Sequence, residues 1–205
     1  MMIPAKLTDK NTVINIITEC FKDNPGVNYI IGKKKNKSNR LKALAEYAFD
    51  FAYYREGIYL TKNKSGLAIC YLLHYKPRKL YDLWLKIKLV TRAIGWSRVH
   101  AVLLHMKKMN ERRHKDGNYL YFWFMGVTNE GRENIKTAVE IMNYIFKLSI
   151  SLHATIFAET SVYKNKMIYQ RLGFQTYNQL SYPNIPLHIW FMRRSPHLSC
   201  RWMKD

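Results

Sequence analysis

A buried strand that leads through a short loop into a helix is the first part of this sequence where chemistry could occur. Segment 119–127 is almost entirely apolar, as strands covered on both faces are. Loop 128–131 follows it, and a helix is expected from about Arg132 to Ser149. The first turn of a helix has peptide N–H groups without partners inside the helix, and these favour phosphate binding. This part of the chain is therefore a candidate anion site.

A second segment of interest follows the next expected strand, 154–160. It spans residues 160–174 and places Asn165 and Tyr169 on a short helix that ends at Gly173. Glycine favours the left-handed conformation that ends many helices. An amide and a phenol are thus expected on a helix close to the anion site.

The remaining elements indicate how these two segments are positioned. A first helix is expected from a cap at Thr8, Asn24-Pro25-Gly26 is expected to break the chain, and a second helix is expected to end at Gly57. Segment 75–116 is helical in character and strongly basic. Strands are expected at 4–7, 58–61, 67–74, 119–127, 154–160, 174–180 and 187–193. This order predicts an α/β fold (mixed α+β) with a mixed sheet. We expect residues 1–205 to form one domain, in which 75–116 is a basic helical insertion. Strand–helix–strand crossovers in the second half predict parallel central strands.

Charge is the unusual bulk property, since 34 Lys and Arg against 14 Asp and Glu give +20. Nucleic acid, an anionic cofactor or substrate, and solubility alone could each account for it. The lysine-rich segment 33–40 is interpreted as a solvated loop. The insertion could be a lid, a nucleic-acid surface or a solvated amphipathic pair, and Trp84, Leu85 and Ile87 favour a covering element. A nucleic-acid partner is not expected, because no known nucleic-acid motif accompanies the charge.

Composition excludes several classes of protein. Apolar residues make up 48% of the chain, which is typical of a globular protein. No apolar run approaches the ~20 residues of a membrane-spanning helix, and the start of the chain has no signal-peptide pattern. The three cysteines and seven histidines show no metal or disulfide spacing. We therefore expect a cytoplasmic protein without a metal or a membrane partner.

The two segments together resemble the GNAT superfamily of N-acetyltransferases. Residues 169–174 are similar to its Tyr-x-x-x-Gly-Phe signature, and 126–137 stands where its pyrophosphate motif lies. One branch of the superfamily is also similar in having a helical insertion before the central strand. The resemblance to that branch extends to the segments 21–25, 158–161 and 190–194, and to Asn165.

The resemblance implies a V-shaped split between two central strands, with acetyl-CoA lying in it. It places the pantetheine arm and the thioester oxygen on the backbone of Met125, Gly126 and Val127. The pyrophosphate would meet the residues that open the following helix, and Asn165 would bind the pantetheine or phosphate portion of the cofactor. The expected pyrophosphate residues are Arg132, Glu133, Asn134, Ile135, Lys136 and Thr137.

The same resemblance implies transfer of an acetyl group to an amine of a small molecule or protein by direct attack. Tyr169 is the candidate general acid, because a phenol can protonate a leaving thiolate, and Glu159 is the candidate general base. Ile135 and Thr137 replace small residues of the pyrophosphate motif, and Glu133 stands beside the expected pyrophosphate. A binding or regulatory module without transferase activity is therefore the alternative. Monomer and homodimer stay equally open.

Overall fold

The core of the protein is one seven-stranded sheet in the order β1-β2-β3-β4-β5-β7-β6. The computed structural model describes residues 1–32, 36–72, 79–114, 119–132 and 135–197. The strands are β1 (Met2–Pro4), β2 (Ile58–Thr61), β3 (Gly66–Leu72), β4 (Tyr119–Val127), β5 (Thr155–Thr160), β6 (Gln175–Tyr182) and β7 (Ile185–Arg194). β4 and β5 run parallel and the other neighbours antiparallel. The predicted mixed sheet with parallel central strands is confirmed.

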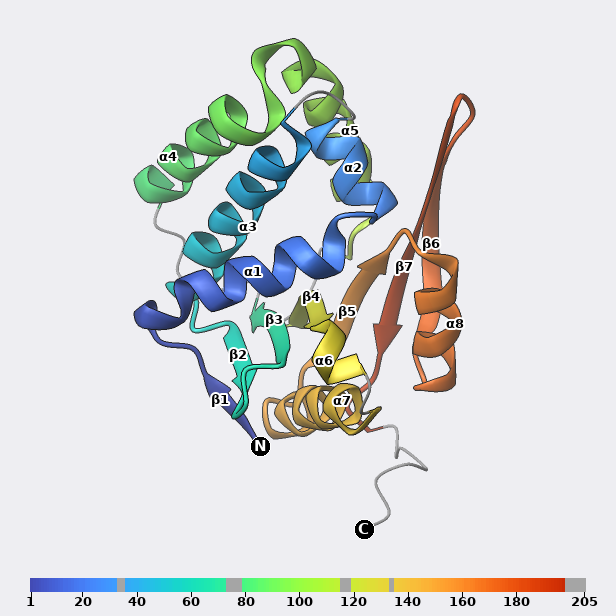
Figure 1. The fold of residues 1–205 in the computed structure, drawn as a ribbon. Coiled ribbons are helices and arrows are strands. Elements are labelled where there is room, and N and C mark those ends of the chain that lie inside the picture. Colours follow the sequence, from blue (N-terminus) through green and yellow to red (C-terminus); the bar gives the residue numbers. More distant parts are fainter. Residues whose placement is uncertain (33–35, 73–78, 115–118, 133–134, 198–205) are drawn as a thin grey trace.

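Helices cover both faces of this sheet (Figure 1). They are η1 (Leu7–Asp9), α1 (Lys10–Phe21), α2 (Pro25–Ile31), α3 (Lys37–Tyr53), α4 (Lys79–Leu89), η2 (Val90–Ile94), η3 (Trp96–Arg98), α5 (Val99–Arg112), α6 (Asn129–Arg132), α7 (Ile135–Ser151) and α8 (Tyr163–Arg171). α1 and α3 pack on one face, and α7 packs on the other. Successive side chains of a strand point to opposite faces, so Tyr119 and Tyr121 face α1 and α3 while Leu120 and Phe122 face α7. The continuous apolar run of β4 follows from this two-sided burial.

Several predicted boundaries in the first half of the chain are wrong. The first strand is Met2–Pro4 and not 4–7, and residues 37–40, predicted as part of a solvated loop, open α3. Thr8 does not cap the first helix: residues 7–9 form a 3₁₀ turn, and α1 begins at Lys10. The expected break at Asn24 is the start of α2, where the Asn24 Oδ1 accepts the Val27 N–H at 3.1 Å. Asn is a good N-cap, and Pro25 loses nothing in the first turn because its missing N–H would have no helical partner. Residues 73–74 and 115–116, predicted as the end of a strand and of the insertion, lie outside the described residues.

The basic insertion folds back onto the domain through α5. The His105 Nδ1 lies 2.7 Å from the Tyr182 Oη at the tip of the β6–β7 hairpin, and the Arg112 Nε donates to the Gln179 carbonyl at 3.2 Å. The Tyr29 ring of α2 packs against both His105 and Tyr182. These contacts hold the insertion, α2 and the hairpin together.

His105 should make this junction sensitive to acid. Its side chain is 4% exposed, and burial lowers its pKa to about 4, against ~6.5 in an unfolded chain. Glu159, Arg113 and Lys108 are the charged groups around it. Between pH ~6.5 and 4, His105 is protonated in the unfolded chain and neutral in the folded chain. The contribution of His105 to the free energy of unfolding is therefore complete above pH ~6.5. It falls by up to ~3 kcal/mol as the pH is lowered to ~4.

The measurement is the urea midpoint between pH 4 and 7, for the wild type, His105→Gln and the exposed-site control His100→Gln. The difference in urea midpoint between the wild type and His105→Gln should change between pH 4 and 7. An equal change in His100→Gln would contradict the assignment.

Candidate functional site

The central strands β4 and β5 are paired along only part of their length. Their parallel pairing ends at Phe122↔Ala158. β4 stays paired with β3 as far as Val127↔Gly66, and β5 stays paired with β7 as far as Thr160↔Trp190. The two central strands therefore diverge while each keeps its outer neighbour, which is the V-shaped split that the sequence predicted.

The peptide groups of β4 alternate between β3 and this split. The Thr128 N–H donates to the Ser65 carbonyl at 2.9 Å, on the β3 side. In an antiparallel pair, residues two apart bond to the same neighbour, so Gly126 also faces β3. The peptide groups of Met125 and Val127 then face the split. The Cys20 Sγ donates to the Val127 carbonyl at 3.2 Å.

A cavity of about 610 Å³ lies against this end of β4. Its walls come from the α1–α2 turn, the end of β4, the region of α6 and α7, and α8. The lining residues are Cys20, Phe21, Asp23, Asn24, Met125, Gly126, Val127, Gly131, Ile135, Ala138, Val162, Asn165, Ile168 and Tyr169. This volume is in the range of small-molecule and cofactor sites.

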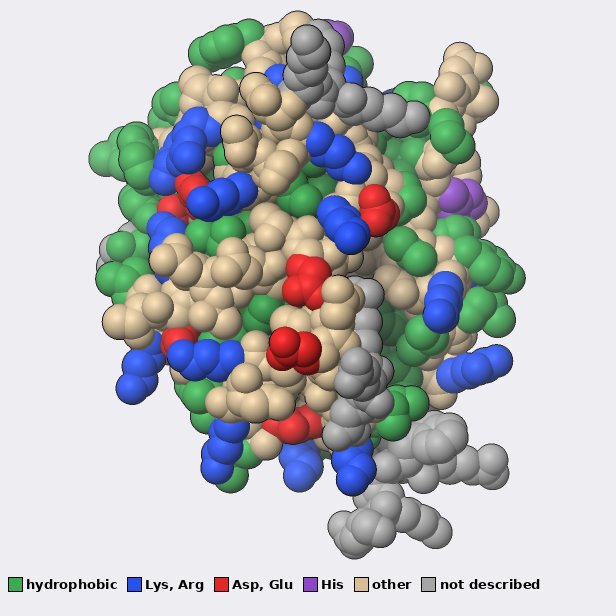
Figure 2. All heavy atoms as spheres, in the orientation of Figure 1, with side chains coloured by type: hydrophobic (Ala, Val, Ile, Leu, Met, Phe, Trp, Pro, Cys, Tyr) green, Lys and Arg blue, Asp and Glu red, His purple; other side chains and the backbone are tan. Residues whose placement is uncertain are grey.

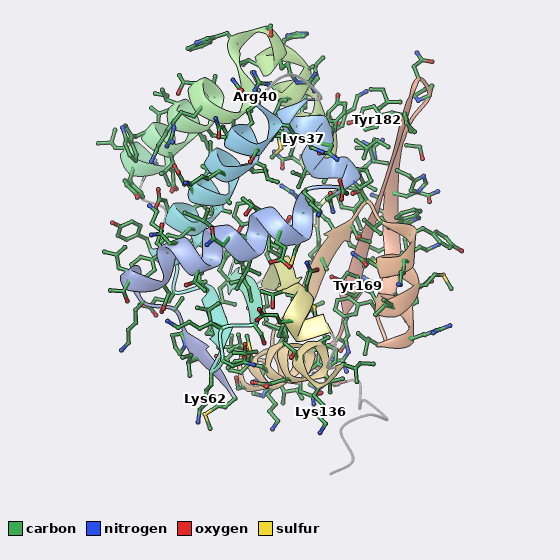
Figure 3. All side chains as sticks on the ribbon, in the orientation of Figure 1. Lys37, Arg40, Lys62, Lys136, Tyr169 and Tyr182 are labelled. Carbon is green, nitrogen blue, oxygen red and sulfur yellow. The ribbon has the colours of Figure 1, made fainter. Side chains whose placement is uncertain are left out.

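Six of the residues that the sequence singled out meet in this cavity, namely Met125, Gly126, Val127, Ile135, Asn165 and Tyr169. Thr137 is buried, and its methyl group lies against Gly66 of β3. Figure 3 labels Lys136 at the margin below α7, away from Tyr169. Arg132 ends α6, but its side chain, like Glu133 and Asn134, lies outside the described residues.

Tyr169 is held in place by the end of its own helix. Gly173 adopts φ +86°, and the Phe174 N–H reaches back to the Tyr169 carbonyl at 2.9 Å. The Tyr169 ring packs against Phe174 and Phe122, with centroid distances of 5.3 and 6.4 Å. Burial raises the Tyr169 pKa to about 12, so the phenol keeps its proton at neutral pH. Glycine and phenylalanine after the tyrosine thus fix its ring beside Phe122, the last residue of β4 that pairs with β5.

Glu159 does not line the cavity. Its Oε1 accepts the Arg113 Nε at 2.6 Å, and its Oε2 accepts the Arg113 Nη2 at 2.9 Å and the Tyr121 hydroxyl at 3.0 Å. As the candidate general base, Glu159 would have to reach the cavity that Tyr169 lines. Because side chains alternate along β5, Ala158 and Thr160 face α7 whereas Glu159 faces the end of α5.

The α1–α2 turn, part of the segment 21–25 that resembles one branch of the superfamily, contributes residues to the site that were given no role from the sequence. The Ser161 hydroxyl accepts the Gly26 N–H at 3.0 Å and donates to the Asn24 Oδ1 at 3.2 Å. This joins the turn to the β5–α8 loop beside the cavity and brings Phe21 and Asp23 to its wall. The Asn-Pro pair was the available signal, because it marks a helix start as well as a chain break.

The donors around the cavity suit a ligand with a long, partly apolar arm and an anionic end. α7 begins at Ile135 in the wall of the cavity, and the edge of β4 faces the split. Gly131 allows the intervening loop to close, because a Cβ there would lie 2.9 Å from the Ser65 carbonyl oxygen. The wall between these donors is largely apolar, with Val127, Ala138 and Ile168.

No protein-family profile matches the sequence, and no curated protein sequence matches it significantly. Solved structures do match. An HPA2-type histone acetyltransferase and related acetyltransferase of Corynebacterium glutamicum is 16% identical, with a TM-score of 0.68 and 97% of each chain covered. Arylalkylamine N-acetyltransferase 2 of Aedes aegypti is 11% identical, with a TM-score of 0.67, covering 96% of this chain and 98% of the other. The C-terminal condensation domain of Ebony, solved with β-alanyl-dopamine, is 12% identical, with a TM-score of 0.65 and coverage of 95% and 98%. At these identities the likeness establishes the fold.

Proposed function

We propose that this chain, which has the fold of the GNAT acetyltransferases, transfers an acetyl group from acetyl-CoA to an amine of a small molecule or a protein. The single observation that supports this most is the split itself. It exposes one edge of β4 to a cavity that lies between the start of α7 and the α1–α2 turn. A donor can enter such a site from the α7 side and an acceptor from the α1–α2 side.

The donor would be held by backbone groups and by α8. The backbone of Met125 and Val127, which line the cavity, would hold the pantetheine arm and the acyl oxygen. Gly126 allows the strand to pack closely on α1. The pyrophosphate would lie at 132–137, where α7 begins, with Asn165 beside the arm. Bound acetyl-CoA supplies the thioester; the chain supplies donors, an apolar wall and a proton.

Tyr169 would supply that proton. The amine nitrogen bonds to the acyl carbon as the carbon–sulfur bond breaks, and the Tyr169 hydroxyl protonates the leaving sulfur. Burial raises the pKa of Tyr169 to about 12, so the phenol is protonated at neutral pH. Because a thiol has the lower pKa of ~8.5, this transfer is uphill, and the phenolate must then regain a proton from solvent. Glu159 is the proposed proton acceptor of the sequence analysis. In that role it would have to exchange its bonds to Arg113 and Tyr121 for one to the amine.

Acetyl-CoA should stabilise the folded chain by mass action. At a concentration 100 times its Kd, the gain is ~2.7 kcal/mol, read as a rise in the thermal midpoint. Ala138→Phe, which fills the cavity from α7, should abolish the rise. Ile150→Phe, on the exposed part of the same helix, should keep it. Absence of a rise in the wild type would contradict the proposal.

Binding without transfer is the second candidate function. Ile135 supports it, because this side chain is 78% exposed and lies in the cavity wall where the family has a small residue. Two results together would favour this alternative over catalysis. Acetyl-CoA would raise the thermal midpoint of unfolding, and no free thiol would be released with any of a panel of amines.

A further inference from the structure

Helix α4 of the insertion is apolar on two opposite sides. Its inner side packs against α3 and η2, where Leu85 is fully buried. Its outer side carries large apolar side chains at spacings of three and four residues, which form one stripe along a helix. They are Leu80 (85% exposed), Leu83 (55%), Trp84 (52%) and Ile87 (52%). Of the residues that favoured a covering element, Leu85 is buried against the domain, whereas Trp84 and Ile87 lie at the surface.

Lysines flank this stripe on both sides. At about 100° of rotation per residue, Lys79 and Lys86 lie along one border and Lys88 along the other. The Lys88 Nζ lies 5.2 Å from the centre of the Trp84 ring. In Figure 2, green and blue side chains alternate along the margin where Figure 1 places α4.

The acidic side chains of α3 and α4 are each paired with a cation. Asp82, the only acidic residue of α4, is turned inward to the Arg55 Nη2 at 2.7 Å. On α3, Glu46 pairs with Arg92, and Asp50 pairs with Lys10 and Lys88. The outer side of α4 therefore combines an apolar ridge with positive charge.

We propose that the stripe Leu80, Leu83, Trp84 and Ile87 docks the protein on an anionic lipid bilayer. A helix lying in the interface inserts its apolar side chains between headgroups while its lysines contact anionic lipid phosphates. Tryptophan favours this boundary, because one end of its ring is apolar and the other is polar. Among the described residues no helix is long and apolar enough to cross a membrane. This proposal departs from the expectation of no membrane partner, which rested on the lack of an apolar run of spanning length.

Two other occupants fit less well. A second copy would bring the same lysine-bordered stripe and another +20 of net charge to the contact. Nucleic acid would pair with the lysines but would leave the leucines and Ile87 exposed. Figure 1 shows α4 at the margin of the molecule, well away from α7 and α8, so docking leaves the cavity accessible.

The test is co-sedimentation of the full chain with vesicles of phosphatidylcholine alone, or of phosphatidylcholine mixed with phosphatidylglycerol, at ~0.15 M salt. The wild type should bind the mixed vesicles and not the neutral ones. Leu80→Ser with Trp84→Ser leaves the net charge unchanged and should lower the partition coefficient at least ~10-fold. Ile150→Ser with Leu152→Ser removes two exposed apolar side chains from the other end of the molecule, and should bind as the wild type does.

Three results would overturn the proposal. The first is no binding to the mixed vesicles. The second is equal binding by the Leu80/Trp84 variant, which would show attraction by net charge alone. The third is dimerisation of the wild type that requires Trp84, which would assign the stripe to a second copy. None of these results depends on acetyl-transfer activity.

Discussion

Tyr169→Phe should lower the turnover number by ~100-fold while the affinity for acetyl-CoA stays within a factor of a few. The substitution removes one hydroxyl and keeps the ring, so the contacts with Phe122 and Phe174 are preserved. What is lost is the proton for the departing thiolate, which is needed only as the carbon–sulfur bond breaks. The effect should therefore appear in turnover and not in binding.

Tyr163→Phe is the matched control, because Tyr163 lies on the same helix, is 61% exposed and does not line the cavity. Thiol release measured at saturating acetyl-CoA gives turnover, and thermal titration gives affinity. The Tyr169 pKa of about 12 adds a second test, since deprotonation of this phenol should not limit the wild-type rate below pH ~11. Unchanged turnover in Tyr169→Phe would remove this residue from the mechanism.

Segments that are buried on both sides were the easiest to predict from the sequence. β4 begins and ends where its apolar run does, because every residue of a central strand must be covered. The helix of Tyr169 was equally clear, since Gly173 adopts the left-handed conformation that its type favours. The signature around Tyr169 thus has a physical basis in one turn and one ring contact.

Properties that depend on which neighbour covers a side chain were not predictable. Glu159 could face the cavity or the insertion, and only the pairing of β5 with β4 and β7 decides between them. The sequence of α4 does not show which of its apolar side chains are exposed and which are buried, because apolar residues on both sides of the helix recur at helical spacing. Asn24 was ambiguous for a related reason, since the same residues break a chain and cap a helix.

The position of Glu159 links the insertion to the split. It is the first residue of β5 after Ala158, the last to pair with β4. Arg113 follows directly on α5, and its guanidinium holds both oxygens of the Glu159 carboxylate. The insertion therefore braces the point where the two central strands separate, in addition to carrying the α4 stripe. Such a brace should contribute to the free energy of unfolding as well as to the geometry of the cavity.

Arg113→Met should destabilise the protein by about 2–4 kcal/mol, because it leaves the Glu159 carboxylate largely buried without its partner. The side chains of Arg113 and Glu159 are 27% and 14% exposed, so the cost stays below that of a fully buried pair. Arg112→Met, one residue earlier, is the control. It removes a guanidinium that is 32% exposed and donates to two carbonyl groups, so it leaves no buried carboxylate without a partner and should cost less than ~1 kcal/mol. Adding Glu159→Met to Arg113→Met should recover most of the loss, because no buried charge then lacks a partner. Urea unfolding of these four proteins and of Glu159→Met alone measures this coupling. Equal losses in Arg112→Met and Arg113→Met would show that the ion pair does not brace the split.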